Sequence, residues 1–341
     1  MRVLVTGGTG FVGSHSVKAL VDAGHEVRLL VRSRARMAAA LQPHGIDDPE
    51  HVVGDVTDPR AVGRALDGCE AVLHAANVYA FDSRRAREML DVNPRGSGLV
   101  LRAAHERGLD PIVHVSSYVV HMPTRDRVLR PGAPLGSPPG AYARSKLAAE
   151  RIARDLQAAA APVVIVYPGG VLGPRDPHLS DFVRIARETL RGRLPLLAPG
   201  SVPVADVRDL ATVHAAVLER GRGARRYLAA AGNLSMGDLV AEARRLTGRR
   251  LPAAYVPGGL AIATGRAADL AQRTLPMRLP IDFEGPWVMV NAPHVDASAT
   301  ERDLGVRFRP ASESLADTYR WLSESGLVTR RQAGMLAAPR A

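Results

Sequence analysis

The 341-residue chain has little cysteine, few aromatic residues and no long apolar run, and each shortage excludes a class of protein. Cys69 is the single cysteine, so an intramolecular disulfide is impossible and a reducing compartment is expected. Aromatic residues make up 4% of the chain, too few for a surface that stacks nucleobases, and the arginines behind the net charge of +11 are scattered. No apolar run approaches the roughly 18 residues of a membrane span, and no signal-like segment precedes the first expected strand. We therefore expect a cytoplasmic protein with no nucleic-acid partner and no membrane span.

Lysine is the scarcest charged residue. Two lysines, Lys18 and Lys146, stand beside 43 arginines. A bias of this size usually follows genome composition rather than function. A lysine that stands inside a motif is therefore informative, and Lys146 stands in one.

The first half of the chain alternates short β-branched runs with helical patterns. Such alternation predicts a parallel sheet covered on both faces, with right-handed crossovers and ligands at the carboxyl edge. Gly24 is expected to end the first helix, and Asp58-Pro59 to begin a later one as N-cap and first helical residue. The expected strands are 3–6, 26–31, 51–53, 71–74, 112–116 and 163–167. The expected helices are 11–21, 60–66, 84–107 and 142–159.

The alternation breaks down after Tyr167. Pro/Gly-rich stretches at 130–140 and 168–177 are expected to be loops at the carboxyl edge, where substrate sites form. A helix over 206–220 and a strand over 225–228 should rejoin the main sheet, and a last helix lies near 314–323. We predict an α/β fold, a doubly wound parallel (Rossmann) sheet with a smaller C-terminal α+β substrate lobe. The expected division is 1–167 and 205–230 for the dinucleotide-binding domain, 168–204 and 231–330 for the substrate lobe, and 331–341 for a tail.

A glycine-rich segment joins the first strand to the first helix. Glycines there allow a tight turn, close approach of the backbone to a pyrophosphate, and close packing of helix on strand. The pyrophosphate would lie on the N–H groups and positive end of the helix. The alternative is an ordinary turn in a chain with 32 glycines, but the position within a series of strand–helix units favours nucleotide binding. The expected contacts from this segment are Gly7, Thr9, Gly10, Phe11, Val12 and Gly13.

The second strand bears on the choice between NAD and NADP. An NAD site usually carries an acid near the end of this strand, to hold the ribose 2′-hydroxyl. Here the strand ends Val31-Arg32-Ser33-Arg34, without an acid, and Arg32 could grip a 2′-phosphate. We therefore expect NADP (NADPH) rather than NAD, although Arg32 could also be a plain surface arginine. Asp55, after the third strand, could accept a hydrogen bond from the adenine amino group or serve as a turn residue, and both interpretations stay open.

Tyr142-Ala143-Arg144-Ser145-Lys146 places a tyrosine and a lysine four residues apart, on one face of a helix. Hydride transfer at a carbonyl carbon needs a proton moved at the oxygen, and a phenol with a pKa of about 10 is a weak base at neutral pH. A neighbouring ammonium group would lower that pKa and could also hold the nicotinamide ribose. Ser117, after the fifth strand, could bind the substrate oxygen, or it could simply cap the strand end.

Further motifs follow in order, and the whole set resembles the extended short-chain dehydrogenase/reductase superfamily, which includes the NAD-dependent epimerase/dehydratase family. The resemblance covers about residues 1–230. It rests on Thr6-Gly7-x-x-Gly10-x-x-Gly13, Asp55, His74-Ala75-Ala76, Asn93, Val115-Ser116-Ser117, Tyr142 with Lys146, Pro168 to Gly173-Pro174, and Val207-Arg208-Asp209.

The resemblance implies a role for each matching residue. Tyr142 would be the general acid/base, Lys146 the ribose anchor that tunes it, and Ser117 the binder of the substrate oxygen. Asn93 would support the proton relay from a helix that Pro94 bends. Further contacts with the cofactor are implied for Val56, Ala75, Ala76 and Pro168. A homodimer through the helices at 84–107 and 142–159 is implied as well.

Within the superfamily, the phosphate loop and the Val31-Arg32 ending are most similar to dihydroflavonol 4-reductase-like and 3β-hydroxysteroid dehydrogenase-like members. Two residues depart from the common pattern. Tyr167 stands where many members have arginine before Pro168, and Pro94 directly follows Asn93. These departures bear on substrate contacts and on the relay.

The leading hypothesis is an NADP(H)-dependent oxidoreductase that interconverts a carbonyl and an alcohol on a largely apolar small molecule. The segments 119–139, 168–203 and 251–291, rich in Leu, Pro, Ala and Gly, would line its pocket. The alternatives are a nucleotide-sugar epimerase that retains NAD and a non-catalytic nucleotide-sensing regulator. Sugar dehydratases of the resembled superfamily typically have an acidic pair directly after the catalytic hydroxyl residue. Here Tyr118-Val119 follows Ser117, and this argues against dehydration. The eleven histidines show no metal-ligand spacing, and no metal is expected.

Overall fold

The computed structural model of the chain describes residues 1–79, 83–194, 196–274 and 282–337. Its centre is a seven-stranded sheet in which every pairing is parallel, in the order β11-β7-β5-β4-β1-β2-β3. The order reverses at β1, which has β2 on one side and β4 on the other, and this reversal opens a crevice at the carboxyl edge. The strands are β1 (Arg2–Thr6), β2 (Glu26–Val31), β3 (His51–Val53), β4 (Ala71–His74), β5 (Ile112–Val115), β7 (Val163–Pro168) and β11 (Arg225–Ala229).

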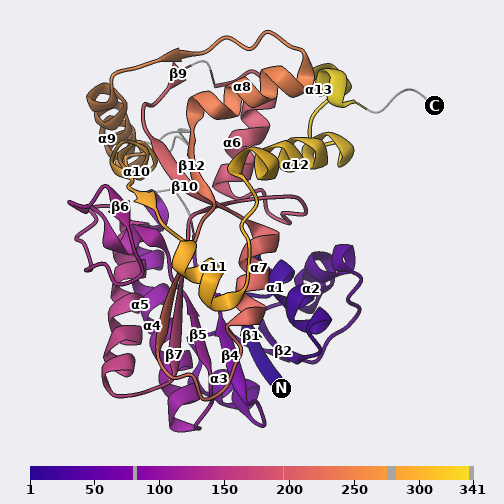
Figure 1. Cartoon of the computed structure of the whole chain (residues 1–341), viewed down its shortest axis with the longest axis vertical. Helices are drawn as coiled ribbons and strands as arrows, with labels where there is room; N and C mark the ends of the chain where they lie inside the picture. Colours follow the sequence, from indigo (N-terminus) through magenta and orange to yellow (C-terminus); the bar gives the residue numbers. More distant parts are fainter. Residues whose placement is uncertain (80–82, 195, 275–281, 338–341) are drawn as a thin grey trace.

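Helices cover both faces of this sheet, as Figure 1 shows. Alternate side chains of each strand point to opposite faces, so β1 sends Val3 and Val5 to one core and Leu4 to the other. The first core is closed by α1 (Phe11–Asp22), α2 (Arg34–Leu41) and α7 (Val207–Ala216). The second is closed by α3 (Pro59–Leu66), α4 (Ala86–Glu106) and α5 (Ala141–Ala158). The predicted doubly wound sheet is confirmed.

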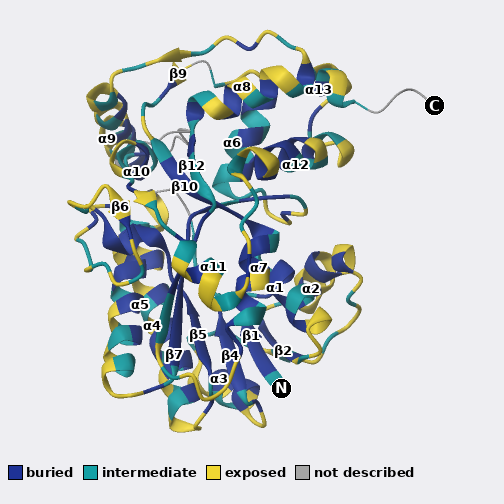
Figure 2. Ribbon diagram, in the orientation of Figure 1, coloured by how far each residue is buried: buried dark blue, intermediate teal, exposed yellow. Residues whose placement is uncertain are grey.

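The local signals in the sequence also place the helix ends well. Gly24 takes the left-handed conformation (φ 80°) just after α1, and Asp58 accepts a hydrogen bond from Arg60 N (2.9 Å) at the start of α3. The strand expected at 225–228 does rejoin the main sheet beside β7. Figure 2 shows the sheet buried between its helices.

A second lobe lies above the carboxyl edge of the main sheet (Figure 1). A three-stranded sheet of β8 (Gly170–Leu172), β10 (Ser201–Asp206) and β12 (Gly232–Ser235) forms its base. Its helices are α6 (Asp181–Leu190), α8 (Met236–Thr247), α9 (Gly258–Thr274), α10 (Glu284–Asn291), α12 (Ala311–Glu324) and α13 (Arg330–Ala333). Short strand pairs join β9 (Leu196–Leu197) to β13 (Ala254–Tyr255) and β6 (Val128–Leu129) to β14 (His294–Val295). The 3-10 helices are η1 (Gln42–His44), η2 (Ser83–Arg85), η3 (Tyr118–His121) and η4 (Gly334–Leu336).

Helix α11 (Ser298–Leu304) returns from the second lobe to the main sheet. Thr300 Oγ1 donates a hydrogen bond to the Leu228 carbonyl on β11 (2.8 Å). The two-part division of the chain remains a proposal, and by its contacts α11 belongs with the sheet. In the expected tail, residues 331–337 include the end of α13 and η4. Residues 338–341 of the tail lie outside the described residues, and so do Pro195 and 275–281 of the expected pocket segments. Within the described ranges, no helix is both long and apolar enough to cross a bilayer.

Candidate active site

The phosphate loop connects β1 to α1 and leaves its backbone open to a ligand. Gly7 has a left-handed φ of 78°, and a Cβ there would lie 2.6 Å from the Ala76 nitrogen. A Cβ at Gly13 would collide with the Gly7 carbonyl, so the helix can approach the loop only without a side chain. Gly10 is the N-cap of α1, and no described side chain caps this end. The first N–H groups of the helix therefore face a backbone cradle that fits a pyrophosphate.

The loop after β4 lies directly against this cradle. Ala76 N donates to Thr6 Oγ1 (3.3 Å), and Thr6 Oγ1 also contacts His74 Nδ1 (2.8 Å). These bonds bring Ala75 and Ala76 beside Gly7, as a shared cofactor site requires. Val56 lies against α4, where a Cβ on Gly96 would be 2.9 Å from its Cγ2.

His178 is a neighbour of the phosphate loop that the sequence reading missed. Its Nε2–H donates to the Thr9 carbonyl (3.1 Å) from the loop after β8. Asp176 shapes this loop, because its carboxylate accepts from His178 N (2.9 Å) and Ser180 N (2.6 Å). No local pattern in the sequence indicates a contact between residues 169 positions apart.

Arg32 and Asp55 lie at the neighbouring ends of β2 and β3. Arg32 is exposed, whereas Arg34 pairs with both oxygens of Asp48 (3.2 Å each). Asp55 Oδ1 accepts from the backbone N (2.9 Å) and hydroxyl (2.7 Å) of Thr57, as a turn residue does. Burial acts to raise the pKa of Asp55, but the Thr57 bonds and the charge of Arg32 outweigh it and lower the pKa overall. The turn interpretation of Asp55 thus has direct support, and its second oxygen is not used in that turn.

Tyr142, Ser117 and Lys146 come together at the carboxyl edge, from α5 and the end of β5. Ser117 lies close enough to the Tyr142 hydroxyl to lower its pKa. Burial raises the pKa of Tyr142 above its ordinary value, and the Glu284 carboxylate adds to the rise, although Ser117 opposes it. The expected lowering of this pKa is therefore wrong, because burial dominates.

Lys146 is buried, and its Nζ donates to the Val115 carbonyl (3.0 Å). Burial lowers the pKa of Lys146 to about 8, and the nearby Glu150 carboxylate opposes this shift. The amine therefore loses its charge within an accessible pH range, unlike an ordinary surface lysine.

Asn93 is buried on α4, and its side-chain amide joins three segments. Its Oδ1 accepts from Val78 N (2.7 Å), and its Nδ2 donates to the Val78 carbonyl and to Ser145 Oγ (2.9 Å each). The side chain therefore fixes the loop after β4 to α5, next to Lys146. Pro94 lies inside α4, where it has no N–H for the preceding turn.

Tyr167, which departs from the common pattern, has a structural partner on α5. Its hydroxyl donates to Glu150 Oε1 (2.6 Å), and Arg154 Nε donates to the same oxygen (2.8 Å). Burial raises the pKa of Tyr167, so the hydroxyl stays protonated and remains a donor. Tyr167 thus supports Glu150 one turn beyond Lys146, while Pro168 ends β7 beside Ala229.

Glu284 of α10 is a second contact that the sequence reading missed. Its carboxylate accepts from Tyr142 N (3.1 Å) and Ala143 N (2.8 Å), and so it caps α5 across 142 positions of sequence. Gly140 makes room, because a Cβ there would collide with this carboxyl group. Burial raises the pKa of Glu284 to about 7, against the effect of the two backbone bonds. The second lobe therefore places a titratable group at the start of the helix that carries Tyr142.

Among the described residues, no three His, Cys, Asp or Glu side chains are grouped as metal ligands would be.

Some relatives and solved structures resemble the chain along nearly its whole length. Sterol demethylase protein B of Methylococcus capsulatus is 27% identical, with 96% of this chain and all of that protein covered. A protein of Synechocystis sp. described as a dihydroflavonol 4-reductase is 29% identical, with 95% of each chain covered. The crystal structure of dTDP-glucose 4,6-dehydratase from Streptomyces venezuelae, solved with NAD bound, is 25% identical with a TM-score of 0.75, over 95% of this chain and 97% of that one.

Residues 3–230 match the profile of the NAD dependent epimerase/dehydratase family. The matched segment contains the phosphate loop, the Tyr142 group and the seven-stranded sheet except for Arg2, the first residue of β1. This chain therefore belongs to the NAD dependent epimerase/dehydratase family, whose chemistry uses a nicotinamide dinucleotide.

Proposed function

We propose that the protein is an NADP(H)-dependent reductase that interconverts a carbonyl and an alcohol on a largely apolar small molecule. The observation that carries this proposal is the group formed by Tyr142, Ser117 and Lys146. A phenol beside a serine hydroxyl, with an amine four residues on along the same helix, lies at the carboxyl edge of the sheet, where open α/β sheets bind their ligands. This arrangement can hold a carbonyl oxygen and move a proton to it.

In the direction of reduction, Tyr142 would act as the proton donor. The bound dinucleotide supplies or accepts a hydride at the carbon atom. Tyr142 donates its proton to the substrate oxygen, and Ser117 orients that oxygen by a hydrogen bond. Because burial raises the pKa of Tyr142, its hydroxyl is protonated at neutral pH and ready to act as an acid. Alcohol oxidation needs the phenolate, which the same burial disfavours.

The phosphate loop, Ala75, Ala76, Val56 and Pro168 would hold the dinucleotide, with Asp55 at the adenine. Lys146 would move from the Val115 carbonyl to the nicotinamide ribose. Arg32 is exposed at the end of β2, with no acid in the strand ending, and would bind a 2′-phosphate. Since Arg34 is paired with Asp48, Arg32 is the freer of the two.

The surroundings of Tyr142 support an uncharged substrate. Its ring packs edge-on against Tyr79, with 4.7 Å between centroids. The Glu284 carboxylate raises the pKa of both Tyr142 and Tyr79, and the Asp181 carboxylate raises that of Tyr79 as well. Acidic neighbours disfavour a phosphorylated ligand. The names of the sterol demethylase and dihydroflavonol reductase relatives suggest a polycyclic compound. We also propose a homodimer through α4 and α5.

A nucleotide-sugar epimerase is the second candidate, supported by the fold shared with the sugar dehydratase. An activity panel separates the two. The protein is incubated with NADPH or NADH and aryl ketones, sterol ketones and aldehydes, and loss of the reduced cofactor is followed by absorbance. In parallel, UDP- and dTDP-hexoses are incubated without added cofactor and the products are separated. Oxidation of NADPH by an apolar ketone is expected; sugar epimerisation without net cofactor turnover would refute the proposal.

A further inference from the structure

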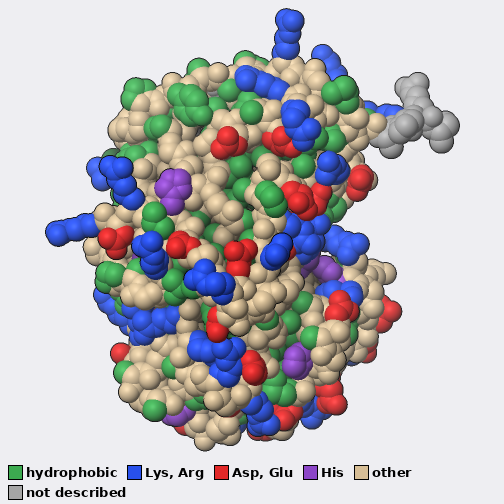
Figure 3. Space-filling model, viewed as in Figure 1, with side chains coloured by type: hydrophobic (Ala, Val, Ile, Leu, Met, Phe, Trp, Pro, Cys, Tyr) green, Lys and Arg blue, Asp and Glu red, His purple; other side chains and the backbone are tan. Residues whose placement is uncertain are grey.

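A cavity of about 590 Å³ lies on the opposite side of the sheet from Tyr142, where α1 and α7 meet α12. Its size is that of a small-molecule site. Neither the phosphate loop nor the Tyr142 group lines it. Figure 3 shows Lys and Arg side chains, with a histidine beside them, on the surface at this junction between the lobes. The lining residues on which the argument depends are His15, Lys18, His44, Arg175, Arg208 and Trp321.

Most charges around the cavity are paired with a neighbour. Lys18 pairs with Asp22, and Arg208 bonds both Asp206 and Asp317 (2.7 Å each). Arg175 differs, since no hydrogen bond or ion pair joins it to any residue in 1–79, 83–194, 196–274 or 282–337. It extends into the cavity from a left-handed backbone position (φ 61°) after β8. Both Arg175 and the lining carboxylate Glu324 are exposed, and no hydrogen bond or ion pair joins Glu324 to another described residue. With Lys18, Arg208 and Arg320 against Asp22 and Asp317, the lining keeps one positive charge more than it has negative charges.

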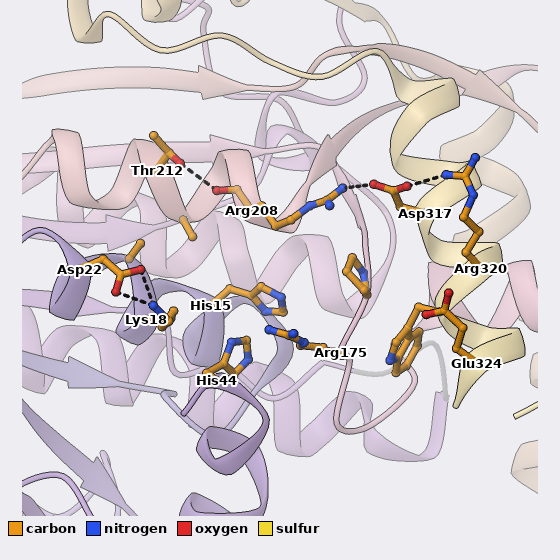
Figure 4. Close-up of a pocket in the computed structure, with 14 residues that line it drawn as sticks. His15, Lys18, Asp22, His44, Arg175, Arg208, Thr212, Asp317, Arg320 and Glu324 are labelled. Atoms are coloured by element: carbon orange, nitrogen blue, oxygen red, sulfur yellow. Dashed lines mark hydrogen bonds and ion pairs between the residues drawn. The ribbon is translucent and has the colours of Figure 1, made fainter. Parts of the chain in front are cut away.

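Two buried imidazoles face this guanidinium group, as Figure 4 shows. His44 is 6% exposed, and its buried Nε2 has no partner among the described residues. The His15 ring packs edge-on against it, with 4.5 Å between centroids, and its Nδ1–H donates to the Phe11 carbonyl (3.0 Å). Burial lowers the pKa of His44 to about 4, with further lowering by Arg175 and Lys18. The ring is thus neutral, and Nε2, when it carries the proton, is a buried donor without a partner in a residue that lines the cavity.

An unsatisfied buried nitrogen costs about 1–3 kcal/mol, and a native site usually provides a partner for it. An acceptor with negative charge would satisfy both His44 and Arg175 at once. We propose that this cavity binds a small oxyanion, a phosphate or carboxylate group, held by Arg175 and His44 with the rest of the ligand against the Trp321 ring. The cavity adjoins the phosphate loop, because His15 hydrogen-bonds the Phe11 carbonyl and His178, three residues after Arg175, hydrogen-bonds the Thr9 carbonyl. Binding to the cavity must therefore be tested while the cofactor site is filled.

Trp321 provides the signal for the test. The chain has two tryptophans, so Trp287→Phe leaves Trp321 as the single indole. In this background, saturated with the oxidised dinucleotide, fluorescence is titrated with inorganic phosphate, with acetate, and with chloride at matched ionic strength. A saturable change with phosphate or acetate and none with chloride is expected, and the stronger of the two identifies the ligand group.

Arg175→Ala should raise the dissociation constant about tenfold to hundredfold, as expected for loss of a charged hydrogen bond. Arg175→Lys, which keeps the charge, should retain part of the affinity, and His44→Phe should weaken binding several-fold. Arg64→Ala, which removes an exposed arginine from α3 on the other face, is the matched control and should bind as the parent does. Thermal unfolding checks that each variant is folded. Equal responses to all three anions, no saturable response, or unchanged affinity in folded Arg175→Ala and His44→Phe would overturn the proposal.

Discussion

Replacing Glu284 with glutamine removes a titratable cap from the helix that carries Tyr142. Glutamine has the same shape and keeps one acceptor for the Tyr142 and Ala143 N–H groups, but it cannot ionise. Burial holds the pKa of Glu284 at about 7 in the folded protein, above the ordinary value of 4.5. The folded state therefore binds this proton more tightly than the unfolded chain, and the free energy of unfolding falls as the pH rises from about 4.5 to above 7.

The size of this effect follows from the pKa shift. One unit corresponds to about 1.4 kcal/mol, so a fully expressed shift amounts to on the order of 3 kcal/mol between about pH 4.5 and pH 8. Glu284→Gln has no such dependence. The hydrogen bond lost in the variant costs about 1 kcal/mol at every pH. This lowers its free energy of unfolding by a constant amount and does not change the pH dependence. The variant should therefore gain stability relative to the wild type as the pH rises.

Urea unfolding of both proteins from about pH 5 to pH 8 measures this difference. Asp282, whose pKa burial raises to about 6, contributes a slope of the same sign to both proteins. Because its charge also raises the pKa of Glu284, the difference between the two proteins includes the coupling of these two carboxyl groups. Glu106→Gln, the same exchange at an exposed site on α4, is the control and should run parallel to the wild type. Parallel curves for Glu284→Gln and wild type would refute the reasoning. In the oxidative direction, loss of the carboxylate should also shift the activity profile of Tyr142 to lower pH.

Three further substitutions test the cofactor site and its support. Arg32→Ala should weaken NADPH about tenfold to hundredfold and leave NADH nearly unchanged, as measured by kcat/KM for both coenzymes; equal loss of both would contradict the assignment. In the wild type, kcat/KM should fall above about pH 8, where Lys146 loses its charge. Lys146→Arg should lower turnover but abolish this fall; a variant whose kcat/KM still falls above pH 8 would contradict the role. Tyr167→Phe leaves Glu150 with one donor fewer and should cost about 1–3 kcal/mol in urea unfolding, with turnover nearly intact.

Strand–helix periodicity was enough to predict the main sheet, because each strand is short, β-branched and bounded by turn residues. The spacing of Tyr142 and Lys146 likewise predicted a shared helix face. What sequence reasoning missed are contacts between distant segments. Glu284 contacts Tyr142 of the catalytic helix across 142 positions, and His178 contacts Thr9 of the phosphate loop across 169. Nothing near either residue in the sequence indicates its partner.

The direction of the Tyr142 pKa shift also escaped the sequence. A lysine four residues away predicts a lower pKa, whereas the structure raises it. The reason is that Lys146 bonds the Val115 carbonyl and the second lobe buries the phenol beside Glu284. Neither the burial nor the neighbouring carboxylate can be seen from the helix alone.

The role of Tyr142 as the proton donor is the central claim, and Tyr142→Phe tests it most directly. The measurement is kcat for reduction of an accepted carbonyl substrate together with the dissociation constant of the dinucleotide. Tyr255→Phe, on the exposed strand β13, is the control. Loss of a general acid typically costs about 10²–10⁴-fold in rate, so turnover should fall at least 100-fold while cofactor binding and the control stay near wild type. A Tyr142→Phe enzyme that keeps most of its turnover would contradict the account.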